Sequence, residues 1–299
     1  MRKYFSEKIE SIFLDNKKTI FITGDLGFNA LENVQEIAKN RFINGGVAEQ
    51  SMIGIAAGLA YKGFETFVYS IAPFVTFRCL EQIKIDVCIH NLPVYIIGNG
   101  GGYGYGIMGA THHAIEDIAC LSALPNMICF FPAFSEDVSF CLEQILERKQ
   151  PSYLRLGLGK SYQRKISISY VNEIINCDNP QLTIIALGPI VHNVIEAVEG
   201  LTNISLFTIL TIPFINMDEK LFLSIAKSRN ILVVEEHVQR GGLGEYLLGY
   251  LIKQKINFGS FEMINALGYP SKLYGNQAFH QEESGLDTKS IKSTISKLI

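Results

Sequence analysis

Short, almost continuously apolar runs alternate along the chain with longer amphipathic stretches. Four runs in the first half are rich in β-branched and aromatic side chains: 19–23, 66–69, 93–98 and 127–131. Such runs are typical of parallel strands that are buried on both faces of a sheet. The intervening stretches carry the apolar spacing of helices: 48–61, 74–90, 114–123 and 135–147. This alternation predicts an α/β fold with a doubly wound, parallel sheet.

A second series of the same kind follows a polar segment. Residues 157–180 interrupt the alternation and end in Cys-Asp-Asn-Pro, so we interpret them as a linker. Beyond the linker, apolar runs predict strands at 182–187, 204–209, 231–235 and 261–266. Amphipathic stretches predict helices at 192–200, 218–228, 244–253 and 288–297. We therefore expect two doubly wound α/β domains, over residues 1–156 and 181–299.

Composition narrows the class of protein. Apolar residues make up 48% and charged residues 18% of the 299 positions, with 26 Lys and Arg against 29 Asp and Glu. The apolar content excludes a disordered chain, and the absence of a basic excess argues against nucleic-acid binding. The charged fraction lies below the usual ~25%. This deficit indicates that much surface is buried, either inside the protein or against another chain.

Some kinds of segment and site are not expected. No run of about 18 apolar residues predicts a membrane span, and the charged, amphipathic start does not resemble a secretion signal. The six cysteines never form Cys-x-x-Cys and mostly lie in apolar stretches: Cys79, Cys88, Cys120, Cys129, Cys141 and Cys177. We therefore expect free thiols in a reducing cytoplasm, no membrane contact and no metal site on this chain.

Candidate chemistry lies where strands end, because ligands of such sheets bind beyond the carboxyl ends of the strands. Four segments follow predicted strands or are rich in glycine: 23–27, 44–50, 98–113 and 235–244. Seven of the twelve residues from Gly98 to Gly109 are glycine. A Gly-x-Gly-x-x-Gly match inside this loop is a weak dinucleotide signal, because no acidic residue follows at the expected distance. A loop of this length in a compact domain is more often functional than not.

Three residues in these segments are suited to acid–base chemistry. Glu49 begins a helix of Gly, Ala, Ile and Leu that has no polar face, so burial would favour its neutral form. The alternative is a first-turn glutamate that interacts with the helix dipole. His112 and His113 lie near a helix N-terminus, where neutral imidazoles suit hydrogen bonding to a substrate or proton transfer. The alternative is that one of the pair caps or packs.

With these motifs the chain resembles the C-terminal half of a transketolase, a thiamine-diphosphate enzyme. The resemblance extends over about residues 19–291 and rests on these segments: Gly24-Asp-Leu-Gly27, Phe42-Ile-Asn-Gly-Gly-Val-Ala-Glu-Gln50, Gly109-Ala-Thr-His-His-Ala-Ile-Glu-Asp117, Leu124-Pro-Asn-Met127, Tyr153-Leu-Arg-Leu-Gly157 and Val233-Val-Glu-Glu-His-Val-Gln-Arg-Gly-Gly-Leu-Gly244. It implies a pyrimidine-binding domain followed by a transketolase C-terminal domain that supports a dimer.

The resemblance also implies roles around the cofactor. Glu49 corresponds to the glutamate that hydrogen-bonds N1′ of the aminopyrimidine and so activates the cofactor. Phe74 corresponds to the aromatic residue that stacks on the pyrimidine, with Phe77 as the alternative. Three further residues lie in segments that, in the family, approach the cofactor or line its pocket: Asp25, Leu26 and Gln82.

The expected substrate side departs from the family in places. His112 corresponds to a substrate-binding histidine, while His113 stands where the family usually has Gln. Met108 replaces an acid that contacts a substrate hydroxyl. Leu158 replaces a phosphate-binding Arg, and neither of the flanking cations, Arg155 and Lys160, clearly takes its place. These departures leave open whether the acceptor is phosphorylated.

The family binds diphosphate and a divalent cation, Mg²⁺ or Ca²⁺, through a Gly-Asp-Gly…Asn motif that does not occur here. The resemblance therefore implies a partner subunit that carries this motif, an α2β2 assembly and a shared thiamine diphosphate. The expected activity is transfer of a two-carbon ketol unit from a ketose to an aldose. Three alternatives stay open: the beta subunit of a 2-oxo-acid dehydrogenase decarboxylating component, 1-deoxyxylulose-5-phosphate synthase, and a non-catalytic dimerisation partner.

Overall fold

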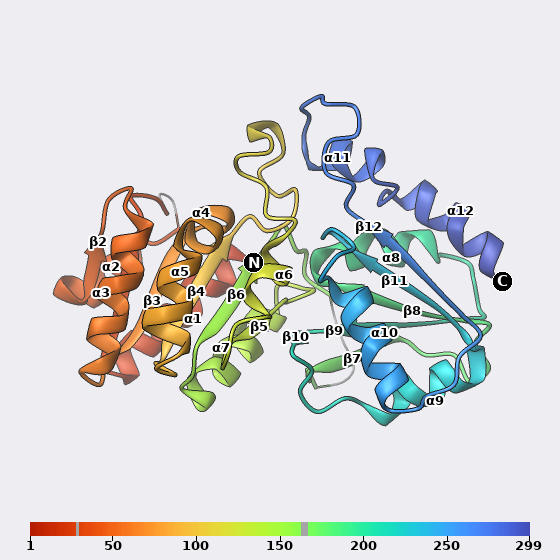
Figure 1. Ribbon diagram of the computed structural model, residues 1–299, viewed down its shortest axis with the longest axis horizontal. Helices are drawn as coiled ribbons and strands as arrows, with labels where there is room; N and C mark the ends of the chain where they lie inside the picture. The colour runs from red at the N-terminus through yellow and green to blue at the C-terminus, as the bar shows by residue number, and fades with distance from the viewer. Residues whose placement is uncertain (28–29, 163–166) are drawn as a thin grey trace.

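The two predicted sheets are present in the computed structural model, which describes residues 1–27, 30–162 and 167–299 (Figure 1). The first sheet has the strand order β10-β5-β6-β4-β3-β1-β2. Its strands are β1 (Thr19–Thr23), β2 (Phe42–Asn44), β3 (Glu65–Ile71), β4 (Val94–Asn99), β5 (Ile128–Phe130), β6 (Ser152–Leu156) and β10 (Thr211–Ile212). All of its pairings are parallel except that of β10 with β5. The predicted α/β class is confirmed.

One helix precedes the first strand of the first sheet, and further helices connect its strands. They are α1 (Arg2–Asp15), α2 (Glu32–Ala38), α3 (Glu49–Tyr61), α4 (Ala72–Thr76), α5 (Leu80–Gln82), α6 (Asp117–Leu121) and α7 (Asp137–Arg148). The stretch 74–90, predicted as one helix, is instead a succession of short turns. A 3-10 turn (Phe77–Cys79) separates α4 from α5, and a π-helical turn (Ile83–Cys88) follows α5.

The second sheet has the order β12-β11-β8-β9-β7. It contains β7 (Val171–Ile175), β8 (Leu182–Leu187), β9 (Ile204–Ile209), β11 (Asn230–Glu235) and β12 (Ser260–Asn265), with β7 antiparallel to β9. Its helices are α8 (Val191–Ala197), α9 (Glu219–Ser228), α10 (Leu243–Lys253), α11 (Gln277–Glu283) and α12 (Thr288–Leu298). Part of the predicted linker, 157–180, is therefore an edge strand, and residues 163–166 of it lie outside the described part of the chain.

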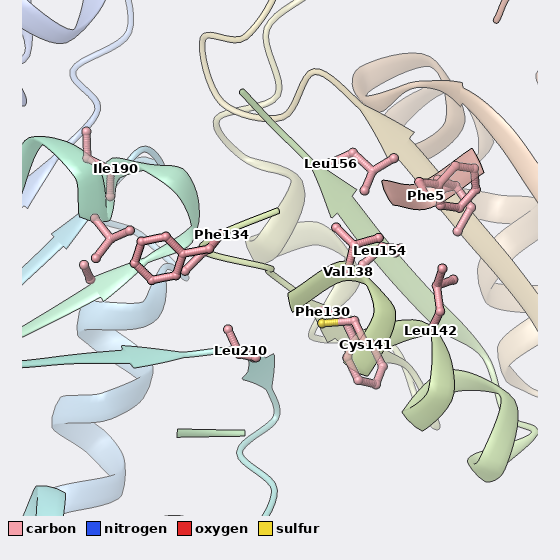
Figure 2. Close-up of a cluster of buried hydrophobic side chains, with 14 of the residues drawn as sticks. Phe5, Phe130, Phe134, Val138, Cys141, Leu142, Leu154, Leu156, Ile190 and Leu210 are labelled. Atoms are coloured by element: carbon pink, nitrogen blue, oxygen red, sulfur yellow. The ribbon is translucent and has the colours of Figure 1, made fainter. Parts of the chain in front are cut away.

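The two sheets share a hydrophobic core. Figure 2 shows Phe130 and Val138 of the first unit in one cluster with Ile190 and Leu210 of the second. Backbone hydrogen bonds also join the two units. Phe131 N–H donates to the carbonyl of Leu210 over 2.8 Å, and β10 pairs with β5. The second unit thus covers an edge of the first sheet that would otherwise expose unpaired backbone groups.

The structure bears on two expectations from the sequence, one about cysteines and one about membrane spans. All six cysteines are free thiols, as predicted. Among the helices that the described residues form, none is long and apolar enough to cross a membrane.

We expect Leu210→Ala to destabilise the chain by about 2–5 kcal/mol, because it opens a cavity where the two units share one core. Leu210 is fully buried. Urea unfolding of the full chain measures the effect. Leu223→Ala is the matched control, since Leu223 is 53% exposed and should change the free energy of unfolding by at most ~0.5 kcal/mol. Equal losses from the two variants would contradict a shared core at Leu210.

Candidate active site

Glu49 lies at the carboxyl edge of the first sheet, as the first residue of α3. Its side chain is 1% exposed. The Ser70 hydroxyl, near the end of β3, donates to Oε1 over 2.9 Å, and Arg78 Nη1 donates to Oε2 over 2.6 Å. A Cβ at Gly24 would lie 3.3 Å from Ser70 Oγ and 3.5 Å from Glu49 Oε1. The glycine after β1 therefore keeps the space around the carboxylate open.

Aromatic and imidazole rings gather beside this carboxylate. The guanidinium carbon of Arg78 lies 4.3 Å from the ring centroid of Phe74. The ring of His112 meets Phe74 edge-on with centroids 5.0 Å apart, and Tyr105 lies 6.0 Å from His112. Thr111 Oγ1 lies 2.9 Å from His112 Nδ1 and orients the imidazole. The structure thus brings together the predicted residues Glu49, Phe74 and His112.

Asp25 and Leu26, two other residues predicted around the cofactor, lie directly after β1. Asp25 has a left-handed backbone (φ 53°), and its Oδ1 accepts from Asn44 Nδ2 over 2.9 Å. The carbonyl of Leu26 accepts from the Thr23 hydroxyl over 2.9 Å. Both residues thus belong to a turn fixed by hydrogen bonds directly after β1.

Phe77 and Gln82 lie further along the same side of the sheet. Phe77 is half-buried in the 3-10 turn after α4. Gln82 Oε1, at the end of α5, is buried and has no hydrogen-bond partner among the described residues. A buried acceptor of this kind is typically satisfied by water or a ligand.

His113 occupies a different environment from His112. Its Nε2 lies 2.8 Å from the carbonyl of Gly106, which only accepts, so Nε2 carries the proton and Nδ1 accepts from Tyr269 OH over 2.7 Å. Its ring also meets those of Tyr103 and the fully buried His280. Burial lowers the pKa of His113 to about 4. These contacts fasten the glycine-rich loop to the second unit.

Arg155 is bound by protein groups. Its Nη2 donates to the carbonyls of Ala114 and Glu236 over 3.1 and 2.8 Å, and its Nε lies 3.5 Å from Asp117 Oδ2. The fully buried Asp117 also accepts from Tyr153 OH over 2.7 Å. Arg155 therefore joins β6, the segment before α6 and the second unit, and its guanidinium is already occupied.

The two acids of the Val233–Gly244 motif bind backbone groups. Glu235 accepts from the N–H groups of Leu243 and Gly244 over 2.7 and 2.9 Å and so caps α10, while burial raises the pKa of Glu235 to about 7. Glu236 accepts from Tyr103 N–H over 2.8 Å and from Gln277. The motif therefore shapes the contact between the two units.

Met108 and Leu158 are both exposed. Met108 ends a 3-10 turn in the glycine-rich loop. Leu158 lines an open cavity of about 490 Å³ together with Arg2, Lys3, Asn99 and Tyr105. Lys160 points elsewhere, since its Nζ lies 3.8 Å from Glu196 Oε1.

Several residues of this region were not found from the sequence: Ser70, Arg78, Tyr105 and the two cations of the cavity, Arg2 and Lys3. The only sequence signal for Arg78 is its position four residues after Phe74, which is about one helical turn. Within the described ranges, no three His, Cys, Asp or Glu side chains gather in a way that could hold a metal ion.

Comparison with known families identifies both units. Residues 1–160 match the profile described as the pyrimidine binding domain of transketolase, and residues 173–291 match the transketolase C-terminal domain. The chain belongs to the transketolase family. This membership confirms the resemblance seen in the motifs and brings with it the thiamine-diphosphate dependence of the family.

Curated relatives of this transketolase-family chain are of two lengths. The chain is 28% identical to the B subunit of apulose-4-phosphate transketolase from Phocaeicola vulgatus over 100% of its own length and 97% of that protein. It is 31% identical to the protein of the same name from Actinobacillus succinogenes over 69% of this chain and 68% of that one. It is 28% identical to 1-deoxy-D-xylulose-5-phosphate synthase of Syntrophus aciditrophicus but spans only 46% of that protein.

Solved structures share the fold of this transketolase-family chain. A structure described as "Split gene transketolase, inactive beta4 tetramer" superposes with a TM-score of 0.82 at 24% identity and is covered to 97%. The transketolase of Campylobacter jejuni superposes with a TM-score of 0.80 at 16% identity, but only 46% of its chain is covered.

We expect Arg155→Ala to destabilise the chain by about 3 kcal/mol or more, because it leaves the buried Asp117 carboxylate without its cation. Urea unfolding measures the loss. Lys160→Ala is the control, since the Lys160 side chain is 72% exposed and its removal should cost at most ~0.5 kcal/mol. A stability change for Arg155→Ala as small as the control's would show that Arg155 does not hold the units together.

We expect the stability advantage of the wild type over His113→Gln to be largest near pH 7 and to shrink as the pH falls toward 4. The folded chain keeps His113 neutral down to a pKa of about 4, whereas an unfolded histidine gains its proton near pH ~6.5. Urea unfolding at several pH values measures the difference. The exposed His90, changed to Gln, is the control. An advantage that is constant or grows in acid would contradict a buried neutral His113.

Proposed function

We propose that this chain is the pyrimidine-binding subunit of a two-chain, thiamine-diphosphate-dependent transketolase. The single observation that carries the proposal is the buried Glu49 carboxylate beside Phe74 and His112, at the carboxyl edge of the first sheet. The reaction is transfer of a two-carbon ketol unit from a ketose to an aldose acceptor.

The residues present suit the pyrimidine half of the cofactor. Glu49 offers a carboxylate to the ring nitrogen N1′, and Phe74 offers an aromatic face. Gln82 Oε1 offers an acceptor that no described residue satisfies, which an amino group would pair. When bound, thiamine diphosphate supplies the electron sink for cleavage of the bond next to the ketose carbonyl.

This chain's own contribution is to place and move protons. Glu49 shares a proton with N1′ in a site of low dielectric, where Ser70 fixes the position of Oε1. His112 lies beside Phe74, and Thr111 occupies its Nδ1. Its Nε2 is therefore the atom that hydrogen-bonds a substrate hydroxyl or passes a proton to it.

The diphosphate and its divalent cation, Mg²⁺ or Ca²⁺, would be held by a partner subunit that carries the Gly-Asp-Gly…Asn domain. The proposed assembly is an α2β2 tetramer in the cytoplasm. Three comparisons support a split enzyme. The chain covers 97% of a relative that is itself named as a subunit, but only 46% of a longer synthase. It also shares its fold with a split-gene transketolase described as an inactive beta4 tetramer.

The sugar acceptor or donor is proposed to carry a phosphate. Two relatives are named for apulose 4-phosphate, and Arg2 and Lys3 line the cavity beside Leu158, where the family's phosphate-binding arginine is missing. These cations sit next to Tyr105, which links the cavity to His112. The exposed Met108 leaves the neighbouring substrate hydroxyl without an acidic partner.

We expect Glu49→Gln to lower the transfer rate of the reconstituted complex by about 10²–10⁴-fold, because a positioned acid–base group contributes that much. The assay follows ketol transfer from xylulose 5-phosphate to an aldose phosphate. Glu262→Gln, at an exposed position on β12, is the control and should keep the wild-type rate.

A Glu49→Gln rate within a factor of ~10 of the wild type would remove Glu49 from the mechanism. If the complex released CO₂ from pyruvate but transferred nothing from xylulose 5-phosphate, the 2-oxo-acid dehydrogenase alternative would replace the proposal. Tight binding of thiamine diphosphate and Mg²⁺ by this chain alone would contradict the split site.

A further inference from the structure

Arg78 is the one cation bound to Glu49 among the described residues, and the proposed function gives it no role. It lies in the 3-10 turn between α4 and α5, at the point where the predicted long helix is broken. Its side chain is 41% exposed, whereas that of its partner Glu49 is 1% exposed. A partly exposed arginine therefore covers a buried carboxylate.

The contacts of Arg78 are those that an aminopyrimidine needs. Its Nη1 donates to Glu49 Oε2 over 2.6 Å, and the flat guanidinium lies over the Phe74 ring at 4.3 Å. A guanidinium is planar, rich in N–H donors and able to stack on aromatic faces. The aminopyrimidine is also planar and nitrogen-rich, and the proposed function assigns it the same carboxylate and the same ring.

A ligand can reach Glu49 only if one of the neighbours of the carboxylate moves away. At 1% exposure the carboxylate is closed to any ligand while its present neighbours stay in place. Ser70 belongs to β3 and is fully buried, so it is fixed by the sheet. Arg78 reaches the carboxylate from a long, partly solvated side chain, and it is the neighbour that can leave without disturbing the sheet.

We propose that Arg78 occupies the place of the cofactor's aminopyrimidine in the unloaded chain and leaves Glu49 and Phe74 when that ring binds. The inference rests on the proposed function. Pairing with Arg78 spares the unloaded chain an isolated buried charge, which would be strongly destabilising. The cofactor then competes with an internal cation. Its apparent affinity is the intrinsic affinity multiplied by the fraction of chains in which Arg78 has left the site.

The test titrates thiamine diphosphate with Mg²⁺ into the complex of this chain with its partner subunit. Arg78→Ala is expected to bind the cofactor about tenfold more tightly than the wild type, as it would if Arg78 filled the site in about nine chains of ten. Added methylguanidinium should occupy the vacated space and weaken binding in Arg78→Ala alone. Arg240→Ala, an exposed arginine before α10, is the matched control with unchanged affinity. Unchanged or weaker binding by Arg78→Ala overturns the inference.

A second measurement follows Arg78 in the wild-type chain and does not depend on how well a variant folds. With ¹⁵N-labelled arginine side chains, the Arg78 guanidinium should show slow exchange in the unloaded complex. Binding of thiamine diphosphate should abolish this slow exchange. A guanidinium that stays protected in the loaded complex overturns the inference.

The two proposals fail in different ways. If the wild-type complex binds no thiamine diphosphate, the proposed function falls and the inference falls with it. If the wild type binds the cofactor while Arg78→Ala does not bind it more tightly, only the inference falls. Arg78→Gln, which can still donate one hydrogen bond to Glu49, should bind with an intermediate affinity.

Discussion

Burial of the Glu49 carboxylate is the constraint on which the rest of this site depends. A buried charge is tolerated only when it is paired and hydrogen-bonded. Both of its oxygens have partners, one from the end of β3 and one from the 3-10 turn after α4. The same requirement explains the glycine after β1, whose missing side chain leaves room for the carboxylate. Arg78 is the one cation that pairs with this carboxylate among the described residues.

A second set of buried charges joins the two units. Arg155 and the buried Asp117 bring β6 and α6 together, and the backbone of Glu236 accepts from the same guanidinium. The glycine-rich loop is held from its other side by His113. This loop carries His112, so the position of the candidate substrate-binding imidazole depends on contacts with the second unit. The C-terminal unit thereby influences the geometry of the candidate site through the loop that carries His112.

The strands of the two apolar series could be predicted because they are short and largely apolar, whereas β2, β6, β7 and β10 and the broken helix after β3 were not. Val75, Cys79, Ile83 and Val87 are all fully buried and recur at a spacing of four. An α-helix repeats every 3.6 residues, so a face repeating every four drifts unless the turn widens, as it does in the π-helical turn over Ile83–Cys88. The 3-10 turn over Phe77–Cys79 is tighter than an α-helix, so the spacing alone did not specify where the helix breaks. The strands β2 and β10 are only three and two residues long and carry no periodicity, β6 contains Arg155, and β7 lies in the polar segment interpreted as a linker.

Glu49 could be found from the sequence because an acid stands out in an apolar helix. Arg78 could not, because its partner lies 29 positions away and the pair forms only once the start of α3 and the 3-10 turn lie side by side. The histidine pair shows the same limit. His112 and His113 are equivalent in sequence, yet one ring meets Phe74 and the other meets Tyr103 and His280. Consecutive residues in a turn point in different directions, so the ring of His112 lies beside Phe74 while that of His113 anchors the loop.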